Sequence, residues 1–297
     1  MSKEGTERAV RDSRVERRPS LLVELISGSV AGAAQVLVGQ PLDTVKTRAQ
    51  VASSPMDILI QTVRKEGFFA LYKGTLSPLI GISGVNSLLF GAYGVSRKMI
   101  SPFPDLSIAQ TAVAGGMAGA VNSILAGPVE LFKIRMQGQY GGADDKRLSR
   151  VARDLWKEWG FRKGIMRGFW VTVAREIPAY AGFYSGYEYT KRQFKFRYGE
   201  NLPIWALLAS GSCGGISYWL ACYPLDVVKS RVQLAPKPPT GGLTYIAREL
   251  GTVYHEGGIK GLYRGLTPSL IRTIPAAAVT FATFEITREY LQAHTSW

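Results

Sequence analysis

The stretch QPLDTVKTRAQ, residues 40–50, decides the fold of this chain because it introduces charges where an uncharged run ends. Residues 25–42 contain no charged side chain, and one acid and two bases follow within the next six positions. The same order returns in GPVELFKIRMQ, residues 127–137, and in YPLDVVKSRVQ, residues 223–233. The prolines lie at positions 41, 128 and 224, so the intervals are 87 and 96 residues. A period this long indicates three tandem copies of one supersecondary unit.

Each copy also contains a charged connector and a second weakly charged run. The connectors are RKEGFFALYKG (64–74), KEWGFRKGIMRG (157–168) and YHEGGIKGLYRG (254–265). Residues 74–96, 106–129 and 201–225 contain no Asp, Glu, Lys or Arg, and each is long enough to cross a bilayer, which takes about 20 residues. The windows 168–187 and 265–284 are interrupted only by Arg175-Glu176 and by Arg272. With residues 25–42 they predict six spans, two per copy, and both termini on one side of the membrane.

The charge balance favours a membrane and an anionic group as partners. The chain has 36 Lys and Arg against 22 Asp and Glu, a formal net charge of +14. The bases flank apolar spans and do not form one stripe, so we expect anionic lipid or an anionic substrate group and no nucleic acid. Cys213 and Cys222, the only cysteines, lie in the fifth predicted span, where we expect structural roles. No metal-binding or phosphate-loop motif occurs, so we expect neither a cofactor nor an enzyme.

The threefold motif, the aromatic-base-glycine triplets and the length together resemble the mitochondrial carrier family, over about residues 20–292. The resemblance implies an all-α membrane protein with six transmembrane helices in a pseudo-threefold bundle of three tandem repeats with short matrix helices. It implies a monomer of the mitochondrial inner membrane that exchanges one small solute at a time by alternating access. The chain then divides into a polar tail (1–20), repeat 1 (21–103), repeat 2 (104–199) and repeat 3 with a short C-terminal tail (200–297).

The same resemblance assigns the motif residues to a gate on the matrix side. Proline removes a helical hydrogen bond, so Pro41, Pro128 and Pro224 are expected to kink the first helix of each repeat inward. The gate would consist of three ion pairs, namely Asp43 with Lys133, Glu130 with Lys229 and Asp226 with Lys46. Gln50, Gln137 and Gln233 match the family's brace position, where an amide bonds to both partners of an ion pair.

A second, weaker gate is implied on the cytoplasmic side. The family pattern of aromatic, acid and base fits residues 187–191 and 284–288, whereas Gly94 replaces the acid in residues 93–97. The implied ion pairs are Glu188 with Arg288 and Glu285 with Arg97, which leaves Lys191 without its expected partner.

Three triplets at the ends of the connectors resemble the family's cardiolipin sites, in which helix N-termini face lipid phosphate. Two are complete, Tyr72-Lys73-Gly74 and Tyr263-Arg264-Gly265. The middle triplet, Met166-Arg167-Gly168, lacks the aromatic residue and is expected to contribute less.

Arg175, Glu176 and Arg272 are the charges at mid-span, where a charge costs about 2.5 to 3.5 kcal/mol and marks a functional site. Neighbours in sequence point different ways on a helix, so we do not expect Arg175 and Glu176 to satisfy each other. An arginine binds a carboxylate bidentately, and Glu176 can hold an ammonium group. The arginine-acid pair resembles that of carriers of amino acids and carnitine.

The second predicted span offers no charge at the matching depth, where Gly81 and Ile82 lie, although Asn86 adds a polar contact. The sequence therefore favours a small zwitterion with a neutral remainder, such as carnitine with its acyl esters or a neutral amino acid. A carrier of basic amino acids (ornithine, arginine or lysine) stays open as an alternative. A passive proton or anion leak and a soluble basic binding protein are the alternatives from other classes.

Overall fold

The computed structural model describes residues 21–51, 54–101, 103, 105–139, 145–199, 202–240 and 242–294. Within these ranges the chain is helical and contains no strand. The long helices are α2 (Leu21–Val51), α4 (Leu76–Ile100), α5 (Ile108–Gln137), α7 (Phe169–Tyr198), α8 (Ile204–Leu234) and α10 (Leu266–His294). The connectors form α3 (Pro55–Glu66), the 3-10 helix η1 (Phe68–Tyr72), α6 (Leu148–Gly160), the π-helix η2 (Phe161–Ile165) and α9 (Thr244–Leu262).

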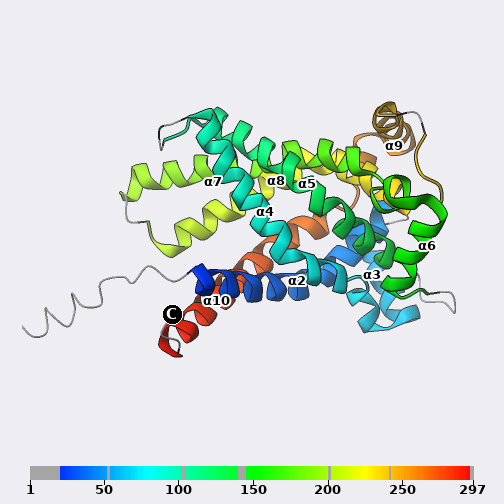
Figure 1. Cartoon of the computed structure of the whole chain (residues 1–297), viewed down its shortest axis with the longest axis horizontal. Coiled ribbons are helices and arrows are strands. Elements are labelled where there is room, and N and C mark those ends of the chain that lie inside the picture. The colour runs from blue at the N-terminus through cyan, green and yellow to red at the C-terminus, as the bar shows by residue number, and fades with distance from the viewer. Residues whose placement is uncertain are drawn as a thin grey trace, which may run out of the picture.

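The six long helices close into a ring, and α3, α6 and α9 gather at one end of it (Figure 1). The helices pack in the order α2, α4, α5, α7, α8, α10 and back to α2. Each repeat thus supplies two neighbouring helices. The three motif helices α2, α5 and α8 alternate with α4, α7 and α10, as expected for three copies of one unit.

Four described segments are long and apolar enough to cross a membrane: Phe68–Ile100, Ile108–Gln137, Ile204–Leu234 and Leu266–His294. The sequence predicts six spans. Helices α2 and α7 have the required length, with 31 and 30 residues. Helix α7 is less apolar because it carries Arg175 and Glu176 in its first half, and the middle of α2 is rich in Gly, Ala, Ser and Gln.

The glycine that precedes each of α4, α7 and α10 fixes the connector against the next repeat. Gly74, Gly168 and Gly265 have φ of +84°, +73° and +86°, a backbone region in which only glycine is unstrained. A Cβ on Gly74 would lie 2.8 Å from the carbonyl oxygen of Lys133, and one on Gly265 would lie 3.3 Å from that of Lys46. The connectors thus approach the backbone of the motif helices too closely for a larger side chain at these glycines.

Candidate substrate cavity and matrix gate

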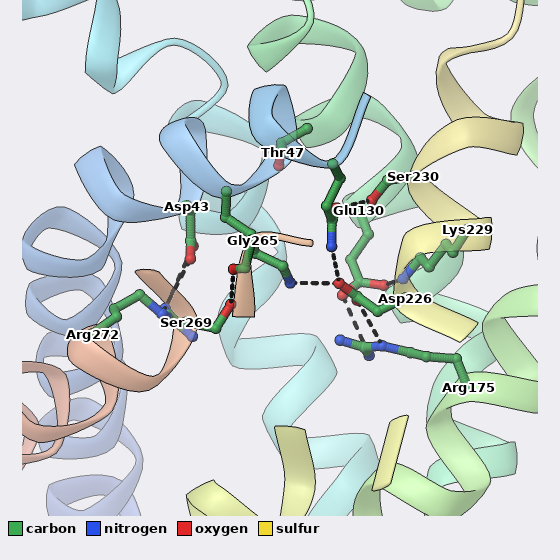
Figure 2. A network of polar contacts seen from close by, with 12 residues as sticks. Asp43, Thr47, Glu130, Arg175, Asp226, Lys229, Ser230, Gly265, Ser269 and Arg272 are labelled. Carbon is green, nitrogen blue, oxygen red and sulfur yellow. Dashed lines mark hydrogen bonds and ion pairs between the residues drawn. The ribbon is translucent and has the colours of Figure 1, made fainter. Parts of the chain in front are cut away.

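The acids and lysines of the three motifs meet at one end of the helical ring. Asp43 Oδ2 lies 2.5 Å from Lys133 Nζ, and Lys46 Nζ lies 2.6 Å from Asp226 Oδ2. Glu130 and Lys229 form the third ion pair (Figure 2). These are the pairings that the resemblance implies, each joining one repeat to another. Because all three are partly or fully buried, their mutual compensation is what permits charges at this depth.

The three motif glutamines are all fully buried, but they do not act alike. Gln50 Nε2 donates to Asp226 Oδ2 at 2.8 Å, and Gln50 Oε1 accepts a hydrogen bond from the Ser230 hydroxyl at 2.6 Å. Gln50 therefore bonds to one partner of an ion pair, not to both.

The other two glutamines depart further from the expected brace. Gln137 exchanges hydrogen bonds with the hydroxyls of Thr47 and Thr44, at 2.8 and 3.2 Å, and not with the ion pair. Neither amide atom of Gln233 has a hydrogen-bond partner among the described residues. The expectation that each glutamine bonds to both partners of an ion pair is thus wrong for all three positions.

The two mid-span arginines lie next to the gate and pair with its acids (Figure 2). Arg175 Nε lies 3.2 Å from Asp226 Oδ1, and Arg272 Nε lies 3.1 Å from Asp43 Oδ1. Arg175 also forms an ion pair with Glu176. The expectation that these sequence neighbours cannot satisfy each other is wrong, because the arginine side chain is long enough to fold back to the adjacent carboxylate.

A cavity of about 1230 Å³ extends from the gate along the interior of the bundle. Besides the gate residues, every long helix except α5 contributes lining residues above the ion pairs, among them Gln35, Ile82, Asn86, Arg175, Tyr180, Tyr184, Tyr218, Trp219, Arg272 and Thr280. It reaches Leu207 near the start of α8 and Phe284 late in α10, so it runs toward the end of the bundle opposite the gate.

Four of the six residues that the sequence assigns to the substrate line this cavity: Arg175, Arg272, Ile82 and Asn86. Gly81 does not, because it packs against α5, where a Cβ would lie 2.5 Å from Val129 Cγ2. Glu176 does not line it either, and its exposed fraction is 1%. These two positions correct the sequence prediction.

The residues that the resemblance assigns to a cytoplasmic gate lie late in α4, α7 and α10. Glu188 pairs with Arg192 of its own helix, at 2.8 Å, and not with Arg288. The Lys191 ammonium lies over the ring of Tyr187, at 5.6 Å, and the Arg97 guanidinium lies 5.9 Å from the ring of Tyr93. The side chain of Glu285 falls outside the described residues. The expected pair of Glu188 with Arg288 is therefore absent here.

The base of the first triplet belongs to a polar cluster that the sequence did not predict. Lys73 Nζ and Arg48 Nη1 lie 2.8 and 2.5 Å from the carboxylate of Glu66, which holds two bases together. Burial alone would raise the pKa of Glu66, but hydrogen bonds and charges from Arg48 and Lys73 outweigh it and hold that pKa below its usual range. The recurring Glu of the connectors, eight to ten residues before the triplet glycine, is the signal that could have revealed this cluster.

The middle and last triplets differ in their exposure to the surroundings. Arg167 is 2% exposed and donates to the carbonyl oxygens of Ala235 and Pro236, at 2.8 and 3.3 Å. Its role in lipid binding is thereby disfavoured, because its guanidinium points into the protein. Tyr263 stacks on Tyr223, with ring centroids 6.1 Å apart, while Arg264 is partly exposed.

Three consecutive repeats with one charged motif each, closing a ring of helices around a central cavity, define a membrane carrier. The chain matches the family described as mitochondrial carrier protein over residues 17–103, 104–198 and 200–295, and it belongs to that family. Members of this family are transporters and not enzymes, and the chain is a multi-pass protein of the mitochondrial inner membrane.

Relatives of nearly equal similarity have different substrates in their names. The mitochondrial glycine transporter YMC1 of Saccharomyces cerevisiae is 35% identical, with 90% of this chain and 91% of the relative covered. The mitochondrial carnitine/acylcarnitine carrier-like protein of Arabidopsis thaliana is also 35% identical, with 90% and 98% covered. The mitochondrial ornithine transporter 1 of Rattus norvegicus is 34% identical, with 91% and 95% covered. Overall identity therefore does not select a substrate.

Proposed function

We propose that this carrier exchanges a small zwitterionic solute, carnitine with its acyl esters or an amino acid, by alternating access. The observation that carries the proposal is the convergence of Arg175 from α7 and Arg272 from α10 on the cavity just above the matrix gate. Guanidinium groups bind carboxylates in a bidentate geometry. The described lining residues include more bases than acids, which leaves a net positive charge for an anionic group. The five bases are Lys46, Lys133, Arg175, Lys229 and Arg272, and the three acids are Asp43, Glu130 and Asp226.

The two arginines also link substrate binding to the gate. Arg175 bonds to Asp226 and Arg272 bonds to Asp43, and both acids are gate members. A substrate carboxylate would compete with these acids for the guanidinium groups. Each gate acid would then keep its lysine and lose its arginine, so fewer ionic contacts would hold the matrix side closed. Substrate binding would thereby favour opening toward the matrix.

The cationic nitrogen of the substrate needs a partner other than the one we expected. Glu176 is paired with Arg175 and does not line the cavity, so we assign it the role of orienting that arginine. Aromatic rings attract cations, and the rings of Tyr218 and Trp219 line the cavity. The Arg175 guanidinium lies 5.3 Å from the Tyr218 ring, so a nitrogen beside a bound carboxylate would come close to these aromatic faces.

The likeness to an ornithine transporter supports a second candidate, a carrier of basic amino acids. Such a substrate has a second cation, which requires an additional acid. Helix α4 contributes Ile82, Ser83, Asn86 and Ser87 to the cavity, and none of them is charged. This wall favours a substrate whose remainder is neutral.

An uptake screen in liposomes tests the proposal. The panel contains carnitine, acetylcarnitine, glycine, glutamate, ornithine, lysine, arginine and ADP, each measured with and without the same solute inside. We expect saturable exchange of a zwitterion, reduced by about 30-fold or more in Arg272→Gln, since losing one partner of a buried charge pair typically costs 2 to 5 kcal/mol. Arg150→Gln, which changes an exposed arginine on α6, is the matched control and should keep the parent rate.

The other outcomes separate the alternatives. Preference for ornithine or lysine would favour the basic amino-acid carrier. Proton or anion flux without any exchanged solute would indicate a leak. Exchange of ADP, or an Arg272→Gln variant with the parent rate, would contradict the proposed carboxylate site.

A further inference from the structure

The glycines of the three motif helices make unequal contacts with the second helix of their repeats. Each motif helix has two glycines at corresponding positions before its proline, namely Gly28 and Gly32, Gly115 and Gly119, and Gly211 and Gly215. In repeat 2 a Cβ on either glycine would lie 2.5 Å from a carbonyl oxygen of α7. In repeats 1 and 3 a Cβ on the first glycine would meet no other described helix within 4 Å, and one on the second would meet only a side chain. Of these three helix pairs, α5 and α7 alone are in backbone contact at the glycines.

Helix α7 also packs closely on α8, its neighbour in the next repeat. A Cβ on Gly182 would lie 2.9 Å from the carbonyl oxygen of Ser217. A Cβ on Gly214 would lie 2.9 Å from the carbonyl oxygen of Phe183. Small residues that allow such close backbone approach favour firm helix packing in a membrane.

Helix α4 is attached to the same group of helices. The Ser77 hydroxyl donates to the carbonyl oxygen of Val129 on α5, at 2.7 Å. The ring of Tyr93 stacks on the ring of Tyr184 on α7, with centroids 3.7 Å apart and planes 6° from parallel. Helices α4, α5, α7 and α8 thus form one packed arc, which we call the larger body.

The other two long helices, α10 and α2, pack on each other and form the smaller body. Its packing against the larger body is sparse on both sides. Between α2 and α4 the hydroxyl oxygens of Ser29 and Ser83 lie 2.9 Å apart. Between α8 and α10 a Cβ on Gly215 would meet, among the described residues, only the side chain of Thr273. We call these two interfaces the seams.

The two mid-span arginines belong to different bodies, and each pairs with an acid of its own body (Figure 2). Arg175 of α7 pairs with Asp226 of α8 in the larger body. Arg272 of α10 pairs with Asp43 of α2 in the smaller body. A carboxylate held by both arginines would therefore lie between the two bodies.

The three ion pairs of the matrix gate are also distributed unequally. Two of them cross from one body to the other, namely Lys46 with Asp226 and Lys133 with Asp43. The third pair, Glu130 with Lys229, joins α5 to α8 within the larger body. Separating the two bodies at the matrix end would thus break two ion pairs and leave the third intact.

We propose that the two bodies rotate against each other at the seams during transport, while α5 and α7 keep their contact in both access states. This inference rests on the proposed alternating access. Closely packed interfaces move as rigid units, and relative motion occurs where few contacts must be remade. Binding of a carboxylate by Arg175 and Arg272 draws the bodies together above the gate. Opening to the matrix breaks the two crossing ion pairs, and the Glu130–Lys229 pair persists.

Engineered disulfides test which interfaces move. In a background without the two native cysteines, Ser29→Cys with Ser83→Cys bridges the α2–α4 seam, and Gly116→Cys with Ala181→Cys bridges α5 and α7. A Cβ on Gly116 would lie 3.9 Å from that of Ala181, which suits a disulfide. Ser29 and Gly116 stand at the same position of their repeats, so the two bridges are matched.

Exchange is measured in liposomes after oxidation with diamide and again after reduction with dithiothreitol. The bridge across the seam should abolish exchange, and reduction should restore it. The α5–α7 bridge should leave the rate of its reduced form unchanged. Reversible loss of exchange with the α5–α7 bridge, or full exchange with the seam bridge, would overturn the proposal. Absence of exchange in the parent chain would instead count against the proposed function.

Distances between spin labels give a second readout that needs no exchanged solute. Exposed residues toward the ends opposite the gate serve as label sites, Val30→Cys with Val95→Cys for α2 and α4, and Val113→Cys with Tyr189→Cys for α5 and α7. In liposomes the distance between α2 and α4 should be distributed more broadly than that between α5 and α7. Equal widths, or a broader α5–α7 distribution, would overturn the proposal whether or not the parent exchanges a solute.

Discussion

The unequal bonding of the motif glutamines yields a comparison between two buried side chains of the same type. Gln50 donates to Asp226 at 2.8 Å and accepts from Ser230 at 2.6 Å. Gln233 is equally buried and has no hydrogen-bond partner among the described residues. We predict that Gln50→Ala destabilises the protein and that Gln233→Ala does so far less, although both remove the same atoms.

The magnitude follows from the two hydrogen bonds. One bond to a charged group contributes about 1.5 to 3 kcal/mol and one neutral bond about 0.5 to 1.5 kcal/mol, so Gln50→Ala should cost about 2 to 4 kcal/mol beyond the packing that both variants lose. At roughly 2 °C or more per kcal/mol, the Tm of Gln50→Ala should lie about 4 to 10 °C below that of Gln233→Ala. Removing the unpaired amide of Gln233 even relieves a desolvation penalty.

Thermal unfolding in detergent of the parent and both variants, in the same lipid and buffer, measures this difference. Far-UV circular dichroism at low temperature should show that all three have the same helix content. Equal destabilisation by the two substitutions would refute the reasoning, because it would mean that both glutamines act as braces or that neither does.

Three further predictions concern the connectors and the gate. Cardiolipin should raise the Tm of the parent, and Gly265→Ala should reduce that rise. At φ of +86° a Cβ is strained, so the substitution displaces the start of α10. A parent that does not respond to cardiolipin would contradict this prediction. Arg48 and Lys73 hold the pKa of Glu66 below its usual value near 4.5. The Glu66 carboxylate therefore stabilises the folded protein fully above about pH 4.5, and this stabilisation is lost as the pH falls through the lowered pKa. The Tm difference between the parent and Glu66→Gln should therefore shrink on acidification from pH 6 to pH 3, and a difference that grows would reverse the sign we assign. Lys229→Gln should slow the exchange of every transported solute alike, since this lysine belongs to the gate, and a changed order of substrate preference at the parent rate would argue against that role.

The sequence predicts the parts of the fold that depend on spacing along one helix. The three Pro-x-acid-x-x-Lys motifs recur in register, so their acids and lysines meet when three equal units close into a ring, as Asp43 and Lys133 do at 2.5 Å. The uncharged windows likewise predict the long helices. They predict helix α7 less clearly, because Arg175 and Glu176 interrupt its apolar run.

The parts that the sequence does not predict depend on contacts across the bundle. Glu176 does not line the cavity, and α7 packs closely on α5 at this residue, whose carbonyl oxygen would lie 2.5 Å from a Cβ on Gly119. Whether a glutamine bonds to an ion pair depends on its neighbours on the next helix. Gln137 forms its hydrogen bonds with the hydroxyls of Thr44 and Thr47 instead. The glutamine stands at the same place in all three motifs, so the sequence pattern does not predict these different hydrogen bonds.

The most direct test of the central claim, that Arg175 and Arg272 receive a substrate carboxylate, compares each exchanged zwitterion with its carboxamide. The carboxamide keeps the nitrogen and nearly the same shape but replaces the carboxylate by a neutral group. With the purified carrier in liposomes, the account predicts that the carboxamide is exchanged at least about 30-fold more slowly and does not compete with the zwitterion, since it cannot draw the arginines away from Asp226 and Asp43. Exchange of the carboxamide at the rate of the parent zwitterion would contradict the account.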